Sequence, residues 1–150
     1  MSAAVITAVG IDVSKYKSTV AARRPGGEVA LLPFDISHDV TGIKKLLERL
    51  HSLSNEGSEI RVVMEHTGMY WRPVALALQH AGFFVSVVNA ILIHDFSDNS
   101  LRKVKTDKAD ALKIANYGLT FWMDLREYSA EDETRQMLKI QNRLYERTTT

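Results

Sequence analysis

The chain has 150 residues, of which 45% are hydrophobic and 25% charged, and its formal net charge is +1. This composition fits one globular domain with a real core, and the length is too short for two comfortable domains. The absence of cysteine excludes disulfides and thiolate metal sites and fits a reducing compartment. There is no long apolar run and no secretory-signal pattern, so we expect a cytoplasmic protein without a membrane span.

The first part of the chain predicts three consecutive strands. Residues 5–13, VITAVGIDV, form an apolar, β-branched run that is typical of a buried strand. Residues 17–24 and 28–35 predict two further strands, and a Pro-Gly-Gly turn at 25–27 joins them. Hairpins of this kind give a sheet an antiparallel portion.

The next part alternates helix and strand, and a strand–helix–strand unit implies a parallel pair with a right-handed crossover. Residues 89–106 give a mixed pattern, a short helix and then a basic loop. The chain therefore predicts an α/β fold with one mixed five-stranded sheet flanked by helices. The segments concerned are helices at 39–53, 71–81 and 107–119 and strands at 60–65 and 83–88.

The tail, from about residue 130 to residue 147, differs from the rest. Met137, Ile140 and Leu144 recur at helical spacing among charged and amide residues, which predicts a projecting amphipathic helix of about five turns. We expect residues 1–124 to form the domain and residues 130–150 to begin a helical connector. The final threonines give no capping signal, as though the chain continued into a longer protein.

Four acids stand where a metal site could form. Asp12 interrupts an apolar strand, where burial of a carboxylate is costly unless it is paired. Glu65 ends another apolar run, and Asp107 and Asp110 share one face at the start of a helix. Oxygen-only anionic sites suit Mg²⁺ or Mn²⁺, and pairs of such ions support phosphoryl transfer. These four residues are the expected catalytic and metal-binding set.

Structural roles are the alternative for each acid taken alone. The conjunction favours catalysis, because two of the four end or interrupt apolar strands, where packing gives no reason for charge. The alternatives are a helix-capping pair for Asp107 and Asp110, a turn with Ser14 and Lys15 for Asp12, and an ion pair with Arg61 or Arg72 for Glu65.

A basic cluster lies next to the last two acids, with five basic residues against two acidic ones between positions 102 and 113. It indicates either phosphate contact or a solvated helix face. Tyr70 and Trp71 could stack on a base or pack in the core, and Ser14 and Lys15 are further candidates, although Ser14 fits a turn better. The expected nucleic-acid contacts are Arg102, Lys103, Lys105 and Lys108.

At these residues the sequence resembles the DEDD transposase family, whose members include the pilin-gene inverting recombinases. The four motifs occur in the family's order and span most of residues 5–120. Ala90 departs from the family, which usually has proline there, and this affects a turn and not the chemistry. The motifs are Gly10-Ile11-Asp12-Val13-Ser14-Lys15, Met64-Glu65-His66-Thr67-Gly68-Met69-Tyr70-Trp71, Val87-Val88-Asn89 and Lys105-Thr106-Asp107-Lys108-Ala109-Asp110-Ala111.

The resemblance implies a RuvC-like domain, a version of the ribonuclease H fold, that acts on DNA with the four acids. It also implies a homo-oligomeric assembly, a structured guide RNA from the mobile element, and a catalytic serine supplied by a second domain beyond a helical connector. The chain alone is then expected to fold, to pair through residues 130–147 and to perform no recombination.

Two other functions remain as alternatives. An actin-like ATPase or sugar kinase also tends to begin with Gly-Ile-Asp, but it needs a second glycine-rich phosphate loop and a second lobe, which this sequence does not show. A non-catalytic nucleic-acid or dimerisation module would have no reason to keep all four acids. The five histidines lack paired ligand spacing, and there is no P-loop motif.

Overall fold

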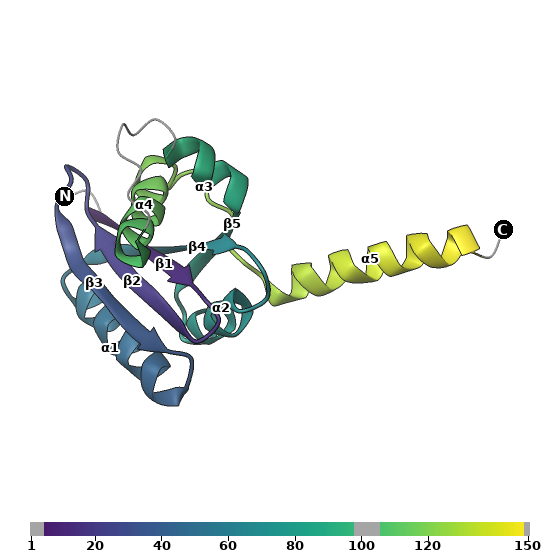
Figure 1. The fold of residues 1–150 in the computed structure, drawn as a ribbon, viewed down its shortest axis with the longest axis horizontal. Coiled ribbons are helices and arrows are strands. Elements are labelled where there is room, and N and C mark those ends of the chain that lie inside the picture. Colours follow the sequence, from purple (N-terminus) through teal and green to yellow (C-terminus); the bar gives the residue numbers. More distant parts are fainter. Residues whose placement is uncertain (1–4, 98–105, 149–150) are drawn as a thin grey trace.

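The computed structural model describes residues 5–97 and 106–148 (Figure 1). The strands in this part of the chain are β1 (Val5–Val13), β2 (Lys17–Arg23), β3 (Val29–Ser37), β4 (Ser58–His66) and β5 (Phe84–Asn89). The helices there are α1 (Val40–Asn55), α2 (Trp71–His80), α3 (Ala90–Ser97), α4 (Asp107–Thr120) and α5 (Ala130–Thr148).

The strands form one sheet in the order β3-β2-β1-β4-β5. The pairs β3–β2 and β2–β1 are antiparallel, and the pairs β1–β4 and β4–β5 are parallel. The antiparallel part follows from two short hairpins, whereas α1 and α2 carry the chain across to the parallel strands. The expected mixed five-stranded sheet with flanking helices is confirmed.

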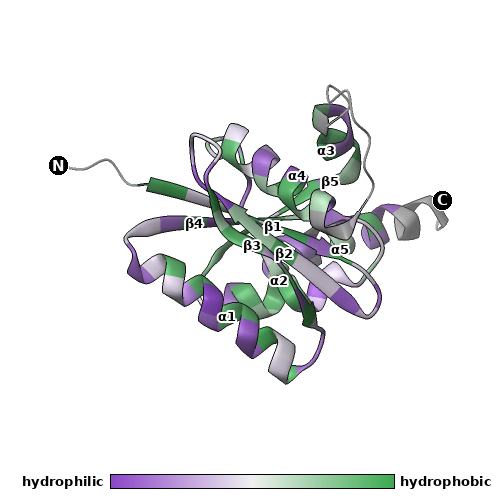
Figure 2. Cartoon of the chain, turned by 60° about the vertical axis from the view of Figure 1, so that its left-hand side comes forward, coloured by the Kyte–Doolittle hydropathy of each residue, from purple (hydrophilic) through white to green (hydrophobic). Residues whose placement is uncertain are grey.

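Alternate residues of β1 face different helices, as strand geometry requires. Val9 and Ile11 join the core that α1 and α2 cover. Gly10 faces α4, since a Cβ built on it would lie 2.2 Å from the carbonyl oxygen of Ala111. Figure 2 shows apolar residues along the central strands, while α1 and α4 carry both polar and apolar residues. The sheet is therefore a middle layer between two layers of helices.

The segment that separates β5 from α4 begins with an ordered helix. The side chain of Asn89 accepts a hydrogen bond from the Ile91 amide at 2.9 Å, and α3 starts at Ala90. The mixed pattern that the sequence shows after residue 89 thus includes the expected short helix. Ala90, which replaces the proline usual in the family, is the first residue of this helix.

The last helix, α5, projects away from the sheet and its covering helices (Figure 1). Met137, Leu138 and Ile140 are exposed on it, and the side chain of Leu144 lies outside the described part. The expected projecting amphipathic helix is confirmed. Among the residues described, no helix is both long enough and apolar enough to cross a membrane.

Candidate active site

Asp12 and Glu65 are the penultimate residues of two neighbouring parallel strands. The last aligned pair of β1 and β4 is Ile11 with Met64, and each acid is the next residue of its strand. Asp12 lies two residues beyond Gly10 and Glu65 two beyond Val63, and both of these residues contact the α3–α4 layer. Because side chains alternate, the two carboxylates point to that same face. Both are half-buried there.

Helix α4 brings a third acid to this edge of the sheet. Its N-cap is Thr106, whose side chain accepts a hydrogen bond from the Ala109 amide at 3.1 Å. The cap is therefore a threonine, and the capping pair that the sequence allowed for Asp107 and Asp110 is not the one that begins the helix. Asp110 directly precedes Ala111, the residue in backbone contact with Gly10, so the start of α4 lies over the end of β1.

The electrostatics of Glu65 show which charges face it. Burial raises the pKa of Glu65, and the negative charge of Asp110 raises this pKa further, whereas His94 of α3 lowers it. Groups from β4, α4 and α3 thus share one electrostatic neighbourhood. Asp12 has polar or electrostatic interactions of its own within the structure.

The donor chemistry of this edge fits a divalent cation. Carboxylate oxygens are the ligands that Mg²⁺ and Mn²⁺ prefer, and a cation would offset the repulsion between Glu65 and Asp110. In the described part of the chain, no three acidic or histidine side chains already form a group that could hold a metal. The side chain of Asp107, the fourth expected ligand, lies outside that part.

Neither arginine offered as a partner for Glu65 pairs with it among the described contacts. Arg61 is bound to Glu59, at 2.6 Å, and Arg72 is bound to Glu133 of α5. Arg61 lies four residues before Glu65 on the same strand, which separates their Cα atoms by about 13 Å. The contact with Glu59 holds the Arg61 guanidinium toward the start of β4, away from Glu65.

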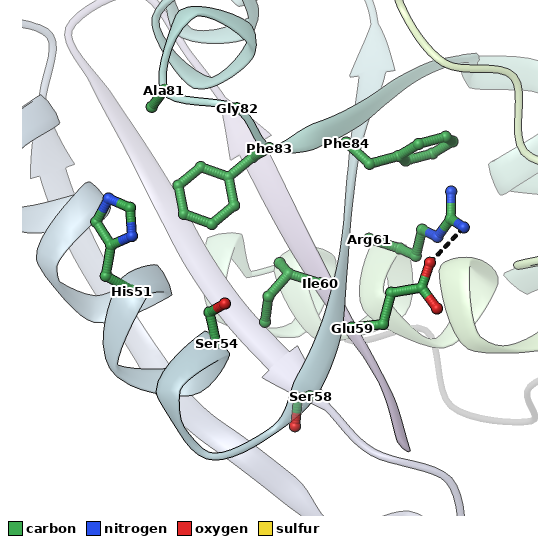
Figure 3. A pocket seen from close by; sticks show the side chains of 10 residues that line it. All are labelled: His51, Ser54, Ser58, Glu59, Ile60, Arg61, Ala81, Gly82, Phe83 and Phe84. Carbon is green, nitrogen blue, oxygen red and sulfur yellow. Dashed lines mark hydrogen bonds and ion pairs between the residues drawn. The ribbon is translucent and has the colours of Figure 1, made fainter. Parts of the chain in front are cut away.

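A cavity of about 480 Å³ lies at the opposite end of β4 from Glu65 (Figure 3). The Arg61 guanidinium stacks 3.9 Å from the centroid of the Phe84 ring, and the His51 ring lies 5.0 Å from that of Phe83. Arg61 and the aromatic rings stabilise this end of the sheet. Asp12 and Glu65 lie instead at the other end of the parallel strands, on the face that α4 covers.

Three further polar residues continue the row of acids across the sheet, and sequence reasoning missed them. Thr19 of β2 is aligned with Asp12, and its hydroxyl donates to Asp35 of β3 at 2.7 Å. The Lys17 ammonium lies 3.4 Å from the same Asp35 carboxylate. The spacing of Lys17 and Thr19 fits one face of a strand, but only the strand register shows that this face is the one that carries Asp12.

The other expected contact residues divide between surface and core. The Ser14 hydroxyl donates to the Lys17 carbonyl at 2.8 Å, which fits the predicted turn, and Lys15 is exposed beside it. Trp71 is only 2% exposed, which supports core packing for this ring, while Tyr70 is 46% exposed and accessible. Base stacking at this loop is thus available to Tyr70 alone of the two.

Most residues of the basic cluster lie outside the part of the chain that the structure describes. Arg102, Lys103 and Lys105 are not among the described residues, and Lys108 is placed on α4 by its backbone only. Their expected contact with phosphate stays a prediction. The backbone position of Lys108, directly after Asp107, puts it in the first turn of the helix that carries Asp110.

One serine–histidine pair also escaped the sequence analysis. The hydroxyl of Ser18 and Nε2 of His38 are 2.7 Å apart. Ser18 is fully buried. It lies two residues before Val20 on β2 and therefore on the same face of the sheet, which packs against α1 and α2 and points away from Asp12. This pair therefore cannot deliver a nucleophile to the acids.

A mixed sheet with the order 3-2-1-4-5, and with acids at the ends of its two central parallel strands, defines a ribonuclease H-like domain. Two solved structures of RuvC from Thermus thermophilus are similar to the chain, one of them in complex with Holliday junction substrate. The complex is 16% identical with a TM-score of 0.48 and covers 79% of this chain and 95% of that one. The second is 15% identical with the same TM-score and covers 77% and 94%.

The chain belongs to the IS110-type DEDD family of transposases, whose model matches residues 9–150. The resemblance predicted from the four motifs is thereby confirmed. The pilin gene-inverting proteins of Moraxella lacunata and Moraxella bovis are each 39% identical to the chain over 62 residues. This match covers 41% of the chain and only 19% of the length of each relative.

Proposed function

We propose that this chain is the metal-dependent catalytic domain of a DNA transposase or site-specific recombinase, which cuts and rejoins DNA strands. The observation that carries the proposal is the placement of Asp12 and Glu65 at the ends of adjacent parallel strands, on the face covered by α4. Asp110 supports it, because its charge raises the pKa of Glu65. Family membership favours this function over an ATPase or a non-catalytic module.

Asp12, Glu65, Asp107 and Asp110 would hold Mg²⁺ or Mn²⁺ in this proposal. Such ions, when bound, activate an attacking oxygen and stabilise the leaving oxygen of a phosphodiester. The protein contributes rigidity: Gly10 lets α4 lie directly on β1, and the Thr106 cap fixes the first turn of that helix. This packing of backbone on backbone would hold Asp110 in a fixed position relative to Asp12.

The DNA would approach along the open edge where the acids lie. Lys108 begins α4 next to Asp107, and Arg102, Lys103 and Lys105 precede that helix in the sequence. Phosphates held by these side chains would lie beside the carboxylates, and the counterions they release would favour binding. Tyr70, exposed on the loop after β4, is a further candidate contact.

The nucleophile is proposed to come from elsewhere in a longer protein. Of the two serines near the β1–β2 turn, Ser14 is engaged in that turn and Ser18 is buried on the other face. Family resemblance suggests a serine from a second domain, a structured guide RNA and a homo-oligomeric assembly. The exposed apolar residues of α5, Met137 and Ile140 among them, would support pairing of subunits.

The proposal is tested by measuring DNA strand cleavage with the complete protein. Asp12→Asn, Glu65→Gln and Asp110→Asn should each lower DNA strand cleavage in Mg²⁺ by about 100-fold or more, since metal assistance contributes several kcal/mol. Glu48→Gln, which removes an exposed acid from α1, should leave cleavage unchanged. Equal cleavage by all four variants would refute the assignment of the site.

A further inference from the structure

A carboxylate in the first turn of the projecting helix α5 contacts the domain through both of its oxygens. Glu133 lies in the first turn of α5, and its Oε2 accepts a hydrogen bond from the Tyr128 hydroxyl at 2.7 Å. Its Oε1 is paired with the guanidinium of Arg72, the second residue of α2. Glu133 is 61 residues from Arg72 in sequence, so this contact joins two distant segments.

Tyr128 is itself fixed to the domain through its backbone. Its amide donates to the carbonyl of Val85 on β5 at 2.6 Å, and its carbonyl accepts from the Gln79 side chain of α2 at 3.2 Å. Burial, with the hydrogen bond to Glu133 as the next cause, raises the pKa of Tyr128 to about 12. The hydroxyl therefore stays protonated and donates to Glu133 throughout the physiological pH range.

The contacts of Glu133 with Arg72 and Tyr128 form the joint between α5 and the domain. Trp71 connects this joint to the edge of the sheet that carries the acids. Its ring meets the Tyr128 ring edge-on, with centroids 5.5 Å apart, and lies 4.9 Å from the ring of His66. The Arg72 guanidinium lies 5.3 Å from the same indole. Because Trp71 is buried in a close-packed core, it cannot shift without moving these neighbours.

The turn that follows Glu65 is held by a backbone hydrogen bond of its own and by the indole of Trp71. The Thr67 amide donates to the Glu65 carbonyl at 3.1 Å, and the Trp71 indole donates to the Gly68 carbonyl at 3.2 Å. Gly68 has a φ of 60°, a conformation that glycine adopts readily, and this lets the turn close over the indole. The backbone at Glu65 is thus one turn away from Trp71.

We propose that Glu133 is a positioning residue that couples the direction of α5 to the orientation of Glu65, through Arg72, Tyr128 and Trp71. The role rests on the proposed function, in which Glu65 is catalytic. A force on α5, exerted by a following domain or by a second subunit, would then reach the acidic site through contiguous packed contacts.

The partly buried setting of the joint separates it from ordinary surface ion pairs. The side chain of Glu133 is 24% exposed and that of Arg72 is 41% exposed. Surface pairs contribute little to stability, but a carboxylate that also accepts a hydrogen bond from a partly buried tyrosine is more strongly held. Glu131, exposed in the same first turn, provides a matched control because its removal changes the charge of the helix N-terminus equally.

The test uses this chain with spin labels on Lys139→Cys in α5 and Lys44→Cys in α1, since the sequence has no other cysteine. Pulsed electron paramagnetic resonance should give one narrow distance distribution for the parent and for Glu131→Ala. Glu133→Ala should broaden or displace it, and Tyr128→Phe should do so to a smaller extent. Glu133→Gln, which keeps the shape and an acceptor, serves as a milder variant that preserves the fold.

The second readout is the nuclear magnetic resonance signal of the His66 ring in the same variants. A shift of this signal in Glu133→Ala, with none in Glu131→Ala, would show that the change reaches the residue next to Glu65. A purely local anchor would broaden the label distances and leave the His66 signal unmoved, and this result would overturn the proposal. So would identical label distances in Glu133→Ala and Glu131→Ala. Neither readout involves DNA or metal, so failure here is distinguishable from failure of the catalytic proposal.

Discussion

Asp12 and Glu65 lie side by side because each follows the last aligned pair of two parallel strands, Ile11 with Met64. A slip of one residue in β1 would turn Asp12 into the apolar core and bring Ile11 to the open edge. The burial of Val9 and Ile11 under α1 and α2 prevents this slip. The positions of the acids are therefore a consequence of hydrophobic packing on the opposite face of the sheet.

Glu65→Gln should stabilise the fold at neutral pH. Burial and Asp110 raise the pKa of Glu65 above its ordinary value of 4.5, so the folded state holds this proton more tightly than the unfolded chain does. Protonated Glu65 therefore contributes its full stability below the pKa of the unfolded chain. This contribution is lost as the pH rises through the raised pKa of the folded state. Urea unfolding should show that the free energy of unfolding of the parent declines between about pH 4 and pH 7, and that this decline is smaller in the variant. Parallel pH profiles would contradict the shift.

Divalent cations should raise the melting temperature if the acids bind them. At a free Mn²⁺ concentration about 100 times the dissociation constant, mass action would add about 2.7 kcal/mol to the stability. Asp12→Asn should reduce this response while the cation-free variant stays folded. A melting curve that does not respond to millimolar Mn²⁺ in either protein would mean that the site is not preformed.

Gly10→Ala should destabilise the domain strongly. The added Cβ would meet backbone atoms of α4, the Ala111 carbonyl oxygen at 2.2 Å and the Ala115 nitrogen at 2.5 Å. Overpacking of this kind costs about 1–3 kcal/mol or more, or roughly 2–4 °C of melting temperature per kcal/mol in a chain of this size. The substitution should also weaken the stabilisation by Mn²⁺, because an α4 displaced from β1 would move Asp110 away from Asp12 and Glu65.

Gly118→Ala is the matched control for that substitution. Its Cβ would meet side-chain atoms only, with Val63 Cγ2 at 2.9 Å and Ala8 Cβ at 3.2 Å, and side chains yield more easily than backbone. Thermal melting should therefore fall less than in Gly10→Ala. If the two variants melt alike, the direct backbone approach of α4 to β1 does not limit packing there.

Changing Lys103 and Lys105 to alanine should weaken DNA binding and flatten its salt dependence. If each side chain neutralises one phosphate, the slope of log affinity against log salt should fall in magnitude by about 1.8. Lys44→Ala, on the exposed side of α1, should leave the slope unchanged. An unaltered slope in the double variant would place the contact surface elsewhere.

The sequence predicted the mixed sheet and its flanking helices because period-two and helical patterns record burial directly. It marked Asp12 and Glu65 as candidate site residues because carboxylates at the ends of apolar strands need a reason beyond packing. It missed Thr19 and Asp35, because their alignment with Asp12 depends on hairpin register, and β2–β3 contains register shifts between Val20 and Arg23. A helix-capping role for Asp107 was an open alternative, but the adjacent Thr106 is the N-cap.

The joint of α5 was also beyond sequence reasoning. Arg72 and Glu133 carry no periodic signal that connects them, and their contact depends on how the segment after α4 returns along β5 to Tyr128. The sequence alone allows Arg72 as a partner for Glu65. Its actual partner is 61 residues away, which a single sequence gives no means to find.

Crystals of the chain grown with Mn²⁺ test the acidic site most directly, because the anomalous scattering of manganese locates the ion independently of the protein density. The proposal predicts a peak at the ends of β1 and β4, within coordination distance of Asp12 and Glu65 carboxylate oxygens and absent in Asp12→Asn crystals. No peak at millimolar Mn²⁺, or one bound only to residues remote from this edge, would contradict a metal-dependent site made by these acids.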